Sequence, residues 1–167
     1  EEAFKVSTHG KKGSVHIDLP KCVLVSEYEK SNKKYKYNKL DEHLTMSSPS
    51  YNIDYVNHLI NNSKKPILLV GQGCNDYSED LRKIAIKGNI PVTTTIHAMG
   101  IFDEVNNLSL EFLGMHGSVY SNYAIQNADL IIAIGTRFDD RITGNIKKYA
   151  PEAFNAFKNG NGGIIHV

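Results

Sequence analysis

The chain has 167 residues, of which 41% are hydrophobic and 22% are charged, a composition ordinary for a globular protein with its own core. Its net charge of +1 creates no global field that would attract nucleic acid, and no run approaches the ~20 apolar residues of a membrane-spanning helix. The charged start lacks the apolar core of a signal peptide, and the two cysteines, Cys22 and Cys74, lack the spacing of a disulfide framework or a zinc site.

The first part of the chain predicts only short elements. Residues 1–19 are typical of the end of a helix, a turn at residues 10–13, and a strand in which Val15, Ile17 and Leu19 alternate with polar residues. Because no earlier element is available for packing, we interpret this pair as the last piece of a domain that begins upstream.

Residues 26–50 have the composition of a linker. Within them, residues 29–39 carry five lysines and two tyrosines, and basic residues interleaved with aromatics can bind single-stranded nucleic acid. No sheet platform is predicted around these tyrosines, so a solvated interdomain linker is the favoured interpretation.

The next part of the chain is more regular. Asn52 can cap a helix, which is followed by a strand at residues 67–70. A second helix is predicted to open on a capping box of Asp76 and Glu79 and to stop at a left-handed Gly88. The residues expected to face the core are Val56, Leu59 and Ile60 in the first helix and Leu81, Ile84 and Ala85 in the second.

The remaining elements continue the alternation of strand and helix, which predicts an α/β fold with a parallel Rossmann-like sheet and helices on both faces. They are a strand at residues 90–96, a loop or short helix at 101–110, a helix capped by Ser118, a strand at 130–134, a helix at 143–157 interrupted at Pro151, and a strand at 162–167.

The strand at residues 130–134 precedes the most polar loop. Its five apolar residues do not alternate, which is typical of an interior parallel strand buried on both faces. Gly135 marks its end, and ligands of open α/β sheets bind outside the carboxyl ends of the strands. Arg137 and Arg141 could hold phosphate or carboxylate oxygens, with Asp139 and Asp140 accepting from hydroxyls or fixing the arginines. The alternative is a surface loop of mutually paired charges, but its position after a buried strand favours a ligand site.

Other motifs are weaker. Gly71 and Gly73 after a strand resemble the opening of a dinucleotide fingerprint, but Asp76 replaces the third glycine, so any nucleotide should bind across several strand ends. Thr95 could direct a hydroxyl toward such a ligand, although β-propensity explains the threonines equally well.

Among the remaining candidates, only His116 has a setting that suggests binding or proton transfer, since it lies between glycines at a predicted strand end. Met115 is core packing by default, and only its place in the loop at residues 113–117 favours a ligand contact instead. Cys74 has no adjacent base and is not assigned as a nucleophile, and metal binding by this chain is not expected.

These residues closely resemble the catalytic subunits of the acetohydroxyacid synthase (acetolactate synthase) family, most of all its fungal type. The similarity covers nearly everything except residues 26–50. The segments that carry it are residues 18–21, Gly71 with Gly73, and residues 91–95, 113–117, 127–145 and 162–166, of which 113–117 and 137–144 are highly specific.

The resemblance implies a truncated piece of a three-domain, thiamine-diphosphate-dependent enzyme. Residues 1–25 would be the C-terminal remnant of the domain that binds the thiamine pyrimidine, residues 26–50 a linker, and residues 51–167 a central FAD-binding α/β domain, incomplete at its C-terminal end. The glutamate that activates thiamine and the motif that holds Mg²⁺ and the diphosphate would belong to absent domains. This fragment would therefore contain no catalytic residue and no metal ligand, and would be inactive alone.

The resemblance also implies site residues. Lys21, Met115, Asp140 and Arg141 would line the mouth of the substrate channel, where sulfonylurea-type herbicides bind, and Arg141 would also meet the carboxylate of the incoming 2-keto acid. The residues implied to line FAD, which has a structural role in the family, are Gly71, Gln72, Thr95, Ile96, Leu113, Gly114, Met115, His116, Gly135, Thr136, Arg137, Asp139, Arg141 and Ile142.

The implied activity is condensation of two pyruvates to 2-acetolactate, or of pyruvate with 2-ketobutyrate to 2-aceto-2-hydroxybutyrate, with loss of CO₂, in branched-chain amino-acid biosynthesis. By resemblance the intact enzyme would be a mitochondrial homo-oligomer with a regulatory subunit, without nucleic-acid or membrane partners. The alternative is a stand-alone nucleotide-binding or regulatory module on the same Rossmann-like scaffold. Nucleic-acid binding through residues 29–39 is the least favoured hypothesis.

Overall fold

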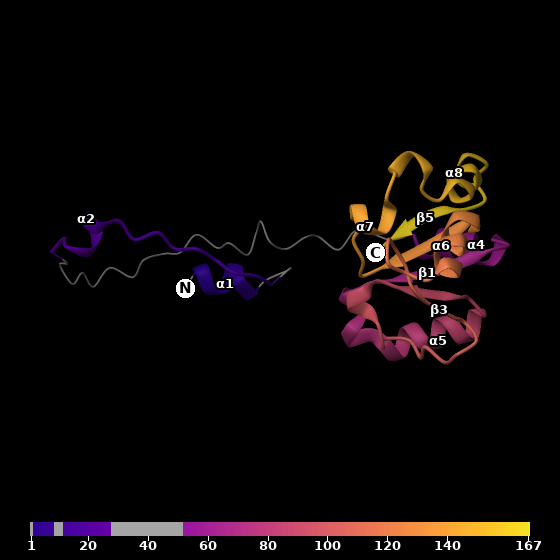
Figure 1. The fold of residues 1–167 in the computed structure, drawn as a ribbon, viewed down its shortest axis with the longest axis horizontal. Coiled ribbons are helices and arrows are strands. Elements are labelled where there is room, and N and C mark those ends of the chain that lie inside the picture. Colours follow the sequence, from indigo (N-terminus) through magenta and orange to yellow (C-terminus); the bar gives the residue numbers. More distant parts are fainter. Residues whose placement is uncertain (1, 9–11, 28–51) are drawn as a thin grey trace. The chain divides into compact units, whose positions relative to one another are not determined.

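The computed structural model describes residues 2–8, 12–27 and 52–167 (Figure 1). The chain divides into two units, Glu1–Tyr51 and Asn52–Val167, and each is described by itself. The expected linker and the lysine–tyrosine segment at residues 29–39 lie outside the described residues, apart from residues 26 and 27. Within the described part, no helix has the length and apolar character needed to cross a membrane.

The described residues of the first unit contain two short helices, α1 (Glu2–Thr8) and α2 (Lys21–Leu24). The strand expected over Val15, Ile17 and Leu19 is wrong, because residues 12–20 form neither helix nor strand. These apolar side chains are exposed, and a strand forms only where a neighbour completes its ladder of hydrogen bonds, which the described part of this unit does not provide. Alternation alone therefore overpredicted regular structure here.

The second unit is built on a five-stranded sheet with all strands parallel. The strands are β1 (Pro66–Val70), β2 (Val92–Thr94), β3 (Ser109–Phe112), β4 (Leu130–Ile134) and β5 (Gly163–His166), in the spatial order β3-β2-β1-β4-β5. β1 and β4 are paired in register from Pro66 with Leu130 to Val70 with Ile134. The α/β fold with a parallel sheet, expected from the alternation of strand and helix, is confirmed.

Helices cover both faces of this sheet. Leu68, Val70 and Ile132 share one core with α4 (Ile53–Asn62) and α5 (Ser78–Gly88). Ile67, Leu69 and Ala133 point to a second core with α6 (Val119–Asn127) and α8 (Pro151–Lys158). Because successive strand residues face opposite sides, β1 and β4 need apolar residues at every position, which explains their unbroken hydrophobic runs.

Two of the predicted helix caps are present. Asn52 Oδ1 accepts a hydrogen bond from the Tyr55 backbone N–H over 3.0 Å, and Ser118 Oγ accepts one from the Ser121 N–H over 3.2 Å. Each side chain satisfies one of the backbone donors that the first turn of a helix leaves unpaired. These caps fix the starts of α4 and α6.

The predicted ends of α5 are wrong. Asp76 lies inside a 3-10 turn, η1 (Gln72–Tyr77), and α5 begins after Tyr77 without a side-chain cap. Gly88 is the last helical residue, and Asn89 adopts the left-handed conformation, with φ 49° and ψ 43°, which asparagine tolerates better than most residues. Leu81 and Ala85 face the core as expected, whereas Ile84 is 47% exposed.

Sequence reasoning missed strand β3 (Ser109–Phe112), because a loop or short helix was predicted for residues 101–110. This edge strand is short and only partly buried, its register against β2 is irregular, and Glu111 has a positive φ of 58°. Its residues, Ser109 to Phe112, do alternate polar and apolar, but four residues are too few to distinguish a strand from a loop. Pro151 begins α8 instead of interrupting a helix, after a short α7 (Asp140–Thr143) and the 3-10 turn η3 (Ile146–Lys148), as suits proline at the first helical position.

Candidate functional site

The predicted nucleotide-site residues gather at one edge of the sheet. Because all the strands are parallel, the segments that follow β1 to β4 leave from the same edge, the carboxyl edge, where ligands of open α/β sheets bind. These segments are residues 71–73, 95–97, 113–117 and 135–142, and they contain every residue that the resemblance implies for FAD. Lys21, the fourth channel residue, is the first residue of α2 and is described only within the first unit.

Glycines bring two of these segments into direct backbone contact. The Gly73 N–H donates to the Gly135 carbonyl oxygen over 2.9 Å, and the Gly71 N–H donates to that of Ile134 over 2.9 Å. A Cβ atom built on Gly71 would lie 2.1 Å from the Gly135 carbonyl oxygen, so no larger residue fits. The close approach of two chain segments therefore requires these glycines whether or not a ligand binds.

A second contact joins the loop after β3 to α7. The Met115 N–H donates to the Arg141 carbonyl oxygen over 2.9 Å. Gly114 has φ +119°, and a Cβ atom on it would lie 2.7 Å from the same carbonyl oxygen. The Asn122 side-chain amide on α6 donates to the Gly114 carbonyl oxygen over 3.0 Å. Met115, Asp140 and Arg141 are thereby held in one small region, although residues 115 and 140 are far apart in sequence. Core packing of Met115 is wrong, because its side chain is 72% exposed.

The charges of the loop after β4 are not mutually paired. Asp139 Oδ1 accepts from the Ile142 N–H over 3.1 Å and so caps α7. Arg137, Asp140 and Arg141 are exposed, and within residues 2–8, 12–27 and 52–167 neither guanidinium group forms an ion pair or a side-chain hydrogen bond. The alternative of a loop of paired charges is therefore wrong. Two fork-shaped cations remain available to an external phosphate or carboxylate.

A cavity of about 400 Å³ opens between the loop after β3, α6 and α7. The predicted site residues that line it are Leu113, Gly114, Met115, Asp140, Arg141 and Ile142. Sequence reasoning missed the rest of its wall, which includes Asn122, Ile125, Gln126 and Tyr149. None of these four residues belongs to a motif that the sequence analysis singled out, so the sequence carried no signal for their place in the cavity.

Other candidates have contrasting surroundings. Thr95 is half-buried, and its backbone N–H donates a hydrogen bond to the Val70 carbonyl oxygen. Its hydroxyl has no partner in the described residues. His116 is exposed and makes no side-chain hydrogen bond within the same residues. The buried Cys74 thiol donates to the Ile134 carbonyl oxygen over 3.3 Å, and burial raises its pKa, which agrees with its not being assigned as a nucleophile.

Sequence reasoning also missed His166 at the end of β5. Its ring Nε2 lies 2.9 Å from the Thr136 carbonyl oxygen, and its ring contacts Phe138 edge-on at a centroid distance of 5.1 Å. These contacts fix the start of the arginine-bearing loop against β5. No pattern marked the residue, because the contact depends on a strand pairing that is visible only in three dimensions.

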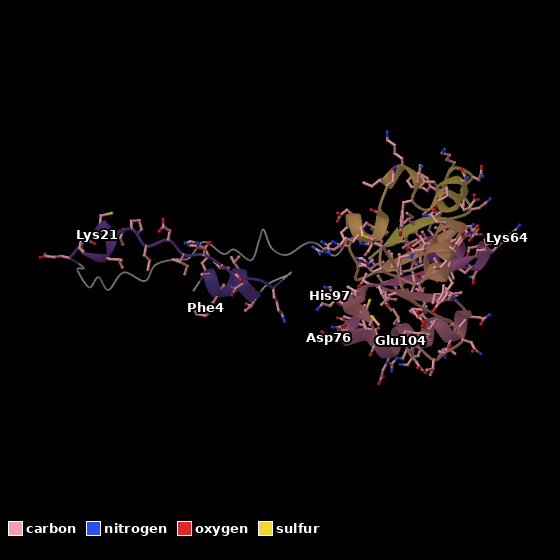
Figure 2. All side chains as sticks on the ribbon, in the orientation of Figure 1. Phe4, Lys21, Lys64, Asp76, His97 and Glu104 are labelled. Atoms are coloured by element: carbon pink, nitrogen blue, oxygen red, sulfur yellow. The ribbon has the colours of Figure 1, made fainter. Side chains whose placement is uncertain are left out.

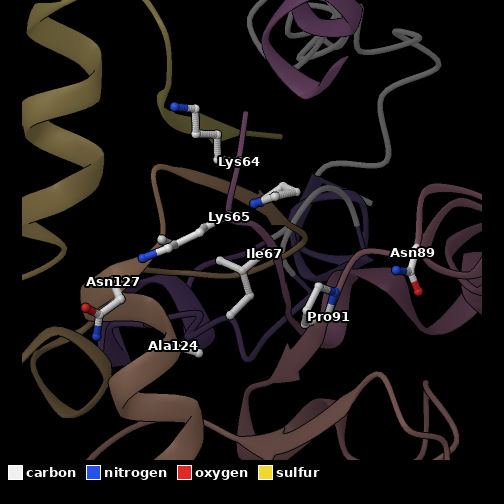
Figure 3. Close-up of a pocket in the computed structure, with 9 residues that line it drawn as sticks. Lys64, Lys65, Ile67, Asn89, Pro91, Ala124 and Asn127 are labelled. Carbon is white, nitrogen blue, oxygen red and sulfur yellow. The ribbon is translucent and has the colours of Figure 1, made fainter. Parts of the chain in front are cut away.

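The opposite edge of the sheet carries a separate cavity of about 390 Å³ (Figure 3). Its lining includes Lys64, Lys65, Asn89 and Asn127, which lie just before or outside the strands. Figure 2 shows Lys64 at one edge of this unit, with Asp76 and His97 at the other. No predicted site residue lines this cavity, and among the described residues no cluster of three or more His, Cys, Asp or Glu could hold a metal ion.

Comparison with known proteins gives a consistent set of relatives. Residues 53–167 match the family model described as the thiamine pyrophosphate enzyme, central domain. The chain is 42% identical to the mitochondrial acetolactate synthase catalytic subunit of Saccharomyces cerevisiae over 174 aligned residues, covering 99% of this chain and 25% of that protein.

Further relatives extend beyond one group of organisms. The mitochondrial acetolactate synthase of Schizosaccharomyces pombe is 42% identical, with 99% of this chain and 26% of that protein covered. A chloroplastic acetolactate synthase of Nicotiana tabacum is 38% identical, with 91% and 23% covered. The chain thus spans about a quarter of the length of the curated relatives it matches.

Proposed function

The chain belongs to the thiamine pyrophosphate enzyme family, of which residues 53–167 form the central domain, and from this premise we propose that it is part of an acetolactate synthase. The enzyme would join two pyruvates, or pyruvate and 2-ketobutyrate, with loss of CO₂, as a step toward branched-chain amino acids. The single observation that carries the proposed site is the pair of unpaired guanidinium groups, Arg137 and Arg141, at the carboxyl edge of the sheet.

We infer that the nucleotide held at this edge is FAD. Arg137 suits phosphate oxygens because its guanidinium group offers several donors in a planar fork. The Gln72 amide and the Thr95 hydroxyl are also without partners in the described residues, so donors are available after β1, β2 and β4. The residues assigned to FAD are Gly71, Gln72, Thr95, Ile96, Leu113, Gly114, Met115, His116, Gly135, Thr136, Arg137, Asp139, Arg141 and Ile142. The bound flavin would stabilise this domain without a redox step.

We assign substrate contact to the residues beside the cavity. Met115 and Asp140 would line the channel through which 2-keto acids reach the reacting centre, together with Lys21 of α2. Arg141 would hold the carboxylate of the second keto acid, a task that suits two parallel N–H donors. Herbicides that block the channel would contact the same residues.

Thiamine diphosphate with Mg²⁺ would supply the carbanion chemistry of the reaction. We assign these groups to parts of the enzyme outside the quarter that this chain spans, and we assign no catalytic residue to this chain. In that arrangement residues 1–25 would complete the domain that binds the thiamine pyrimidine, residues 26–50 would be a linker, and residues 51–167 the FAD-binding domain. The 167-residue chain by itself is then expected to form no acetolactate, even with FAD, thiamine diphosphate and Mg²⁺ present.

The partners follow from the relatives. We propose a mitochondrial location, because the fungal relatives are named mitochondrial, and a regulatory subunit, because the relative from Saccharomyces cerevisiae is named a catalytic subunit. A homo-oligomer is part of the same proposal.

The experiment that tests the site is titration of the chain with FAD, followed by quenching of flavin fluorescence. Arg137→Ala should weaken binding by about tenfold or more, since it removes a charge-assisted contact to phosphate. Lys83→Ala is the matched control, because Lys83 is an exposed cation on α5 paired with Asp80. Absence of saturable binding, or equal affinities for wild type and Arg137→Ala, would contradict the assignment.

A further inference from the structure

The cavity of about 390 Å³ at the amino edge of the sheet, where the strands begin, has no part in the proposed function (Figure 3). Its volume is within the range of small-molecule sites. It lies where three connections meet, namely the link between α4 and β1, the link between α5 and β2, and the end of α6. A ligand held here would therefore lie at the opposite ends of the strands from the residues assigned to FAD.

Much of the cavity wall is apolar. Ile67 and Ala128 are buried, whereas Pro91 and Ala124 are half-buried. Ala124 lies in the last turn of α6 and Ala128 ends that helix, and their small side chains leave the hollow open. An apolar ligand group that covers this wall would remove it from water, which favours binding.

Two lysines that border the cavity carry unpaired charges. Lys64 and Lys65 are exposed, and in the described part of the chain neither ammonium group forms an ion pair or a hydrogen bond. The Asp129 carboxylate accepts instead from the backbone N–H groups of both lysines, over 2.7 and 2.9 Å, and so holds this segment in place. Figure 3 shows both lysines on one side of the cavity, with Asn89 on the other.

We propose that this cavity binds a small amphipathic carboxylate, with its apolar body against Pro91 and Ala124 and its carboxylate on the ammonium groups of Lys64 and Lys65. Each ammonium group offers a positive charge and three N–H donors. The Asn89 side-chain amide, which also has no partner among the described residues, adds an uncharged donor. Because the site combines an apolar wall with two cations, both the charge and the apolar body of the ligand contribute to its affinity.

The test uses the 167-residue chain and 3-phenylpropanoate as the probe, with binding followed by isothermal titration calorimetry. Lys65→Ala should weaken binding by about threefold, the effect of one partly exposed charge pair, and the double variant Lys64→Ala/Lys65→Ala by about tenfold. 3-Phenylpropanamide, which keeps the ring and loses the charge, should bind more weakly than the acid. Acetate, which keeps the charge and loses the ring, should not saturate the site at the same concentration.

Ala124→Leu tests the apolar wall. The larger side chain would extend into the space next to Pro91, so binding of 3-phenylpropanoate should be lost while both lysines remain. The thermal unfolding midpoint shows whether this variant is folded. The lysine variants change only exposed side chains, so they decide the question even if Ala124→Leu does not fold.

The control variant is Lys148→Ala, which removes an exposed cation from η3 that does not line this cavity and should leave binding unchanged. Four outcomes would each overturn the proposal: no saturable binding of 3-phenylpropanoate at millimolar concentration, equal binding by wild type and the double lysine variant, an equal loss in Lys148→Ala, or undiminished binding by folded Ala124→Leu.

A competition experiment separates this site from the proposed flavin site. Saturating FAD should leave the affinity for 3-phenylpropanoate unchanged, because the two sites lie at opposite edges of the sheet. Displacement of the probe by FAD would mean that the probe binds at the carboxyl edge, and it would overturn this proposal while the assignment of FAD stands. Failure of FAD to bind would contradict only the proposed function.

Discussion

The backbone N–H of Met115 donates to the carbonyl oxygen of Arg141 over 2.9 Å, so the loop after β3 is tied to the helix that follows β4. β3 and β4 are separated in the sheet by β2 and β1, and this bond therefore joins segments from different parts of the carboxyl edge. It brings a proposed channel residue next to the arginine proposed to hold the substrate carboxylate. Any change that separates the loop after β3 from α7 should disturb both roles.

Gly114→Ala should destabilise the second unit through this contact. The new Cβ would lie 2.7 Å from the Arg141 carbonyl oxygen, and φ +119° is unfavourable for alanine. Gly144→Ala is the matched control, because Gly144 also has a positive φ, of 57°, but nothing lies within 4 Å of its built Cβ. We expect a loss of about 1–3 kcal/mol from strain in both variants, with Gly114→Ala losing more. Urea unfolding measures this, and equal losses would show that the loop and α7 separate at no cost.

Asp129→Asn should weaken the entry to β1. One carboxylate oxygen of Asp129 accepts from the Lys64 N–H over 2.7 Å and the other from the Lys65 N–H over 2.9 Å. Asparagine offers one acceptor and one donor, so one backbone N–H would lose its partner, at a cost of about 1–3 kcal/mol. In contrast, Asp80→Asn removes only an exposed pair with Lys83 and should cost about 0–1 kcal/mol. Similar unfolding free energies for the two variants would refute the role given to Asp129.

The two cysteines should differ in alkylation rate. Cys22 is exposed, whereas Cys74 is buried, donates to the Ile134 carbonyl oxygen, and has a pKa raised by burial. A raised pKa means less thiolate at any given pH, and the thiolate is the reactive form. At pH 8, iodoacetamide should therefore modify Cys22 first, and Cys74 should react at a comparable rate only after denaturation. Peptide mass spectrometry over time decides this, and early labelling of Cys74 would contradict its closed environment.

The sequence predicted the interior of this fold well because burial leaves a local pattern. The apolar run of β4 and the polar caps Asn52 and Ser118 each depend on residues close in sequence. The gathering of the segments after β1 to β4 at one edge followed from the same logic, since parallel strands place their following loops together. By contrast, Tyr149 lines the cavity and His166 contacts Thr136 only because distant segments pack together.

The errors at the ends of α5 concern residues with more than one favourable local conformation. Gly88 and Asn89 are both suited to a left-handed helix end, and the helix ends at Asn89, whose N–H donates to the carbonyl oxygens of Ala85 and Ile86. Asp76 could have capped α5, but it lies inside the 3-10 turn η1 (Gln72–Tyr77) instead. In the same turn the Gly73 N–H donates to the Gly135 carbonyl oxygen. At the start of α5, therefore, a tertiary contact accompanies the conformation that the local sequence did not predict.

Arg141→Lys, in the complete enzyme proposed above, should impair the use of the second keto acid much more than the first decarboxylation. The Arg141 side chain is exposed, and its backbone carbonyl carries the bond to Met115, so the substitution leaves the loop contact in place. Lysine keeps the charge but replaces a planar fork by a point charge with different reach. Loss of one charge-assisted hydrogen bond should cost about 1.5–3 kcal/mol at the second step, or roughly ten- to hundredfold in rate.

The measurement compares CO₂ release from pyruvate with formation of acetohydroxyacid in the same variant. Arg137→Lys is the control, because the Arg137 guanidinium is assigned to FAD. The affinity of this variant for FAD should fall, while the ratio of the two rates should stay at the wild-type value. If Arg141→Lys instead lowers both rates in parallel, Arg141 serves mainly to hold FAD or α7. The proposed contact with the substrate carboxylate would then be wrong, since only a group that acts after the first half-reaction changes the ratio.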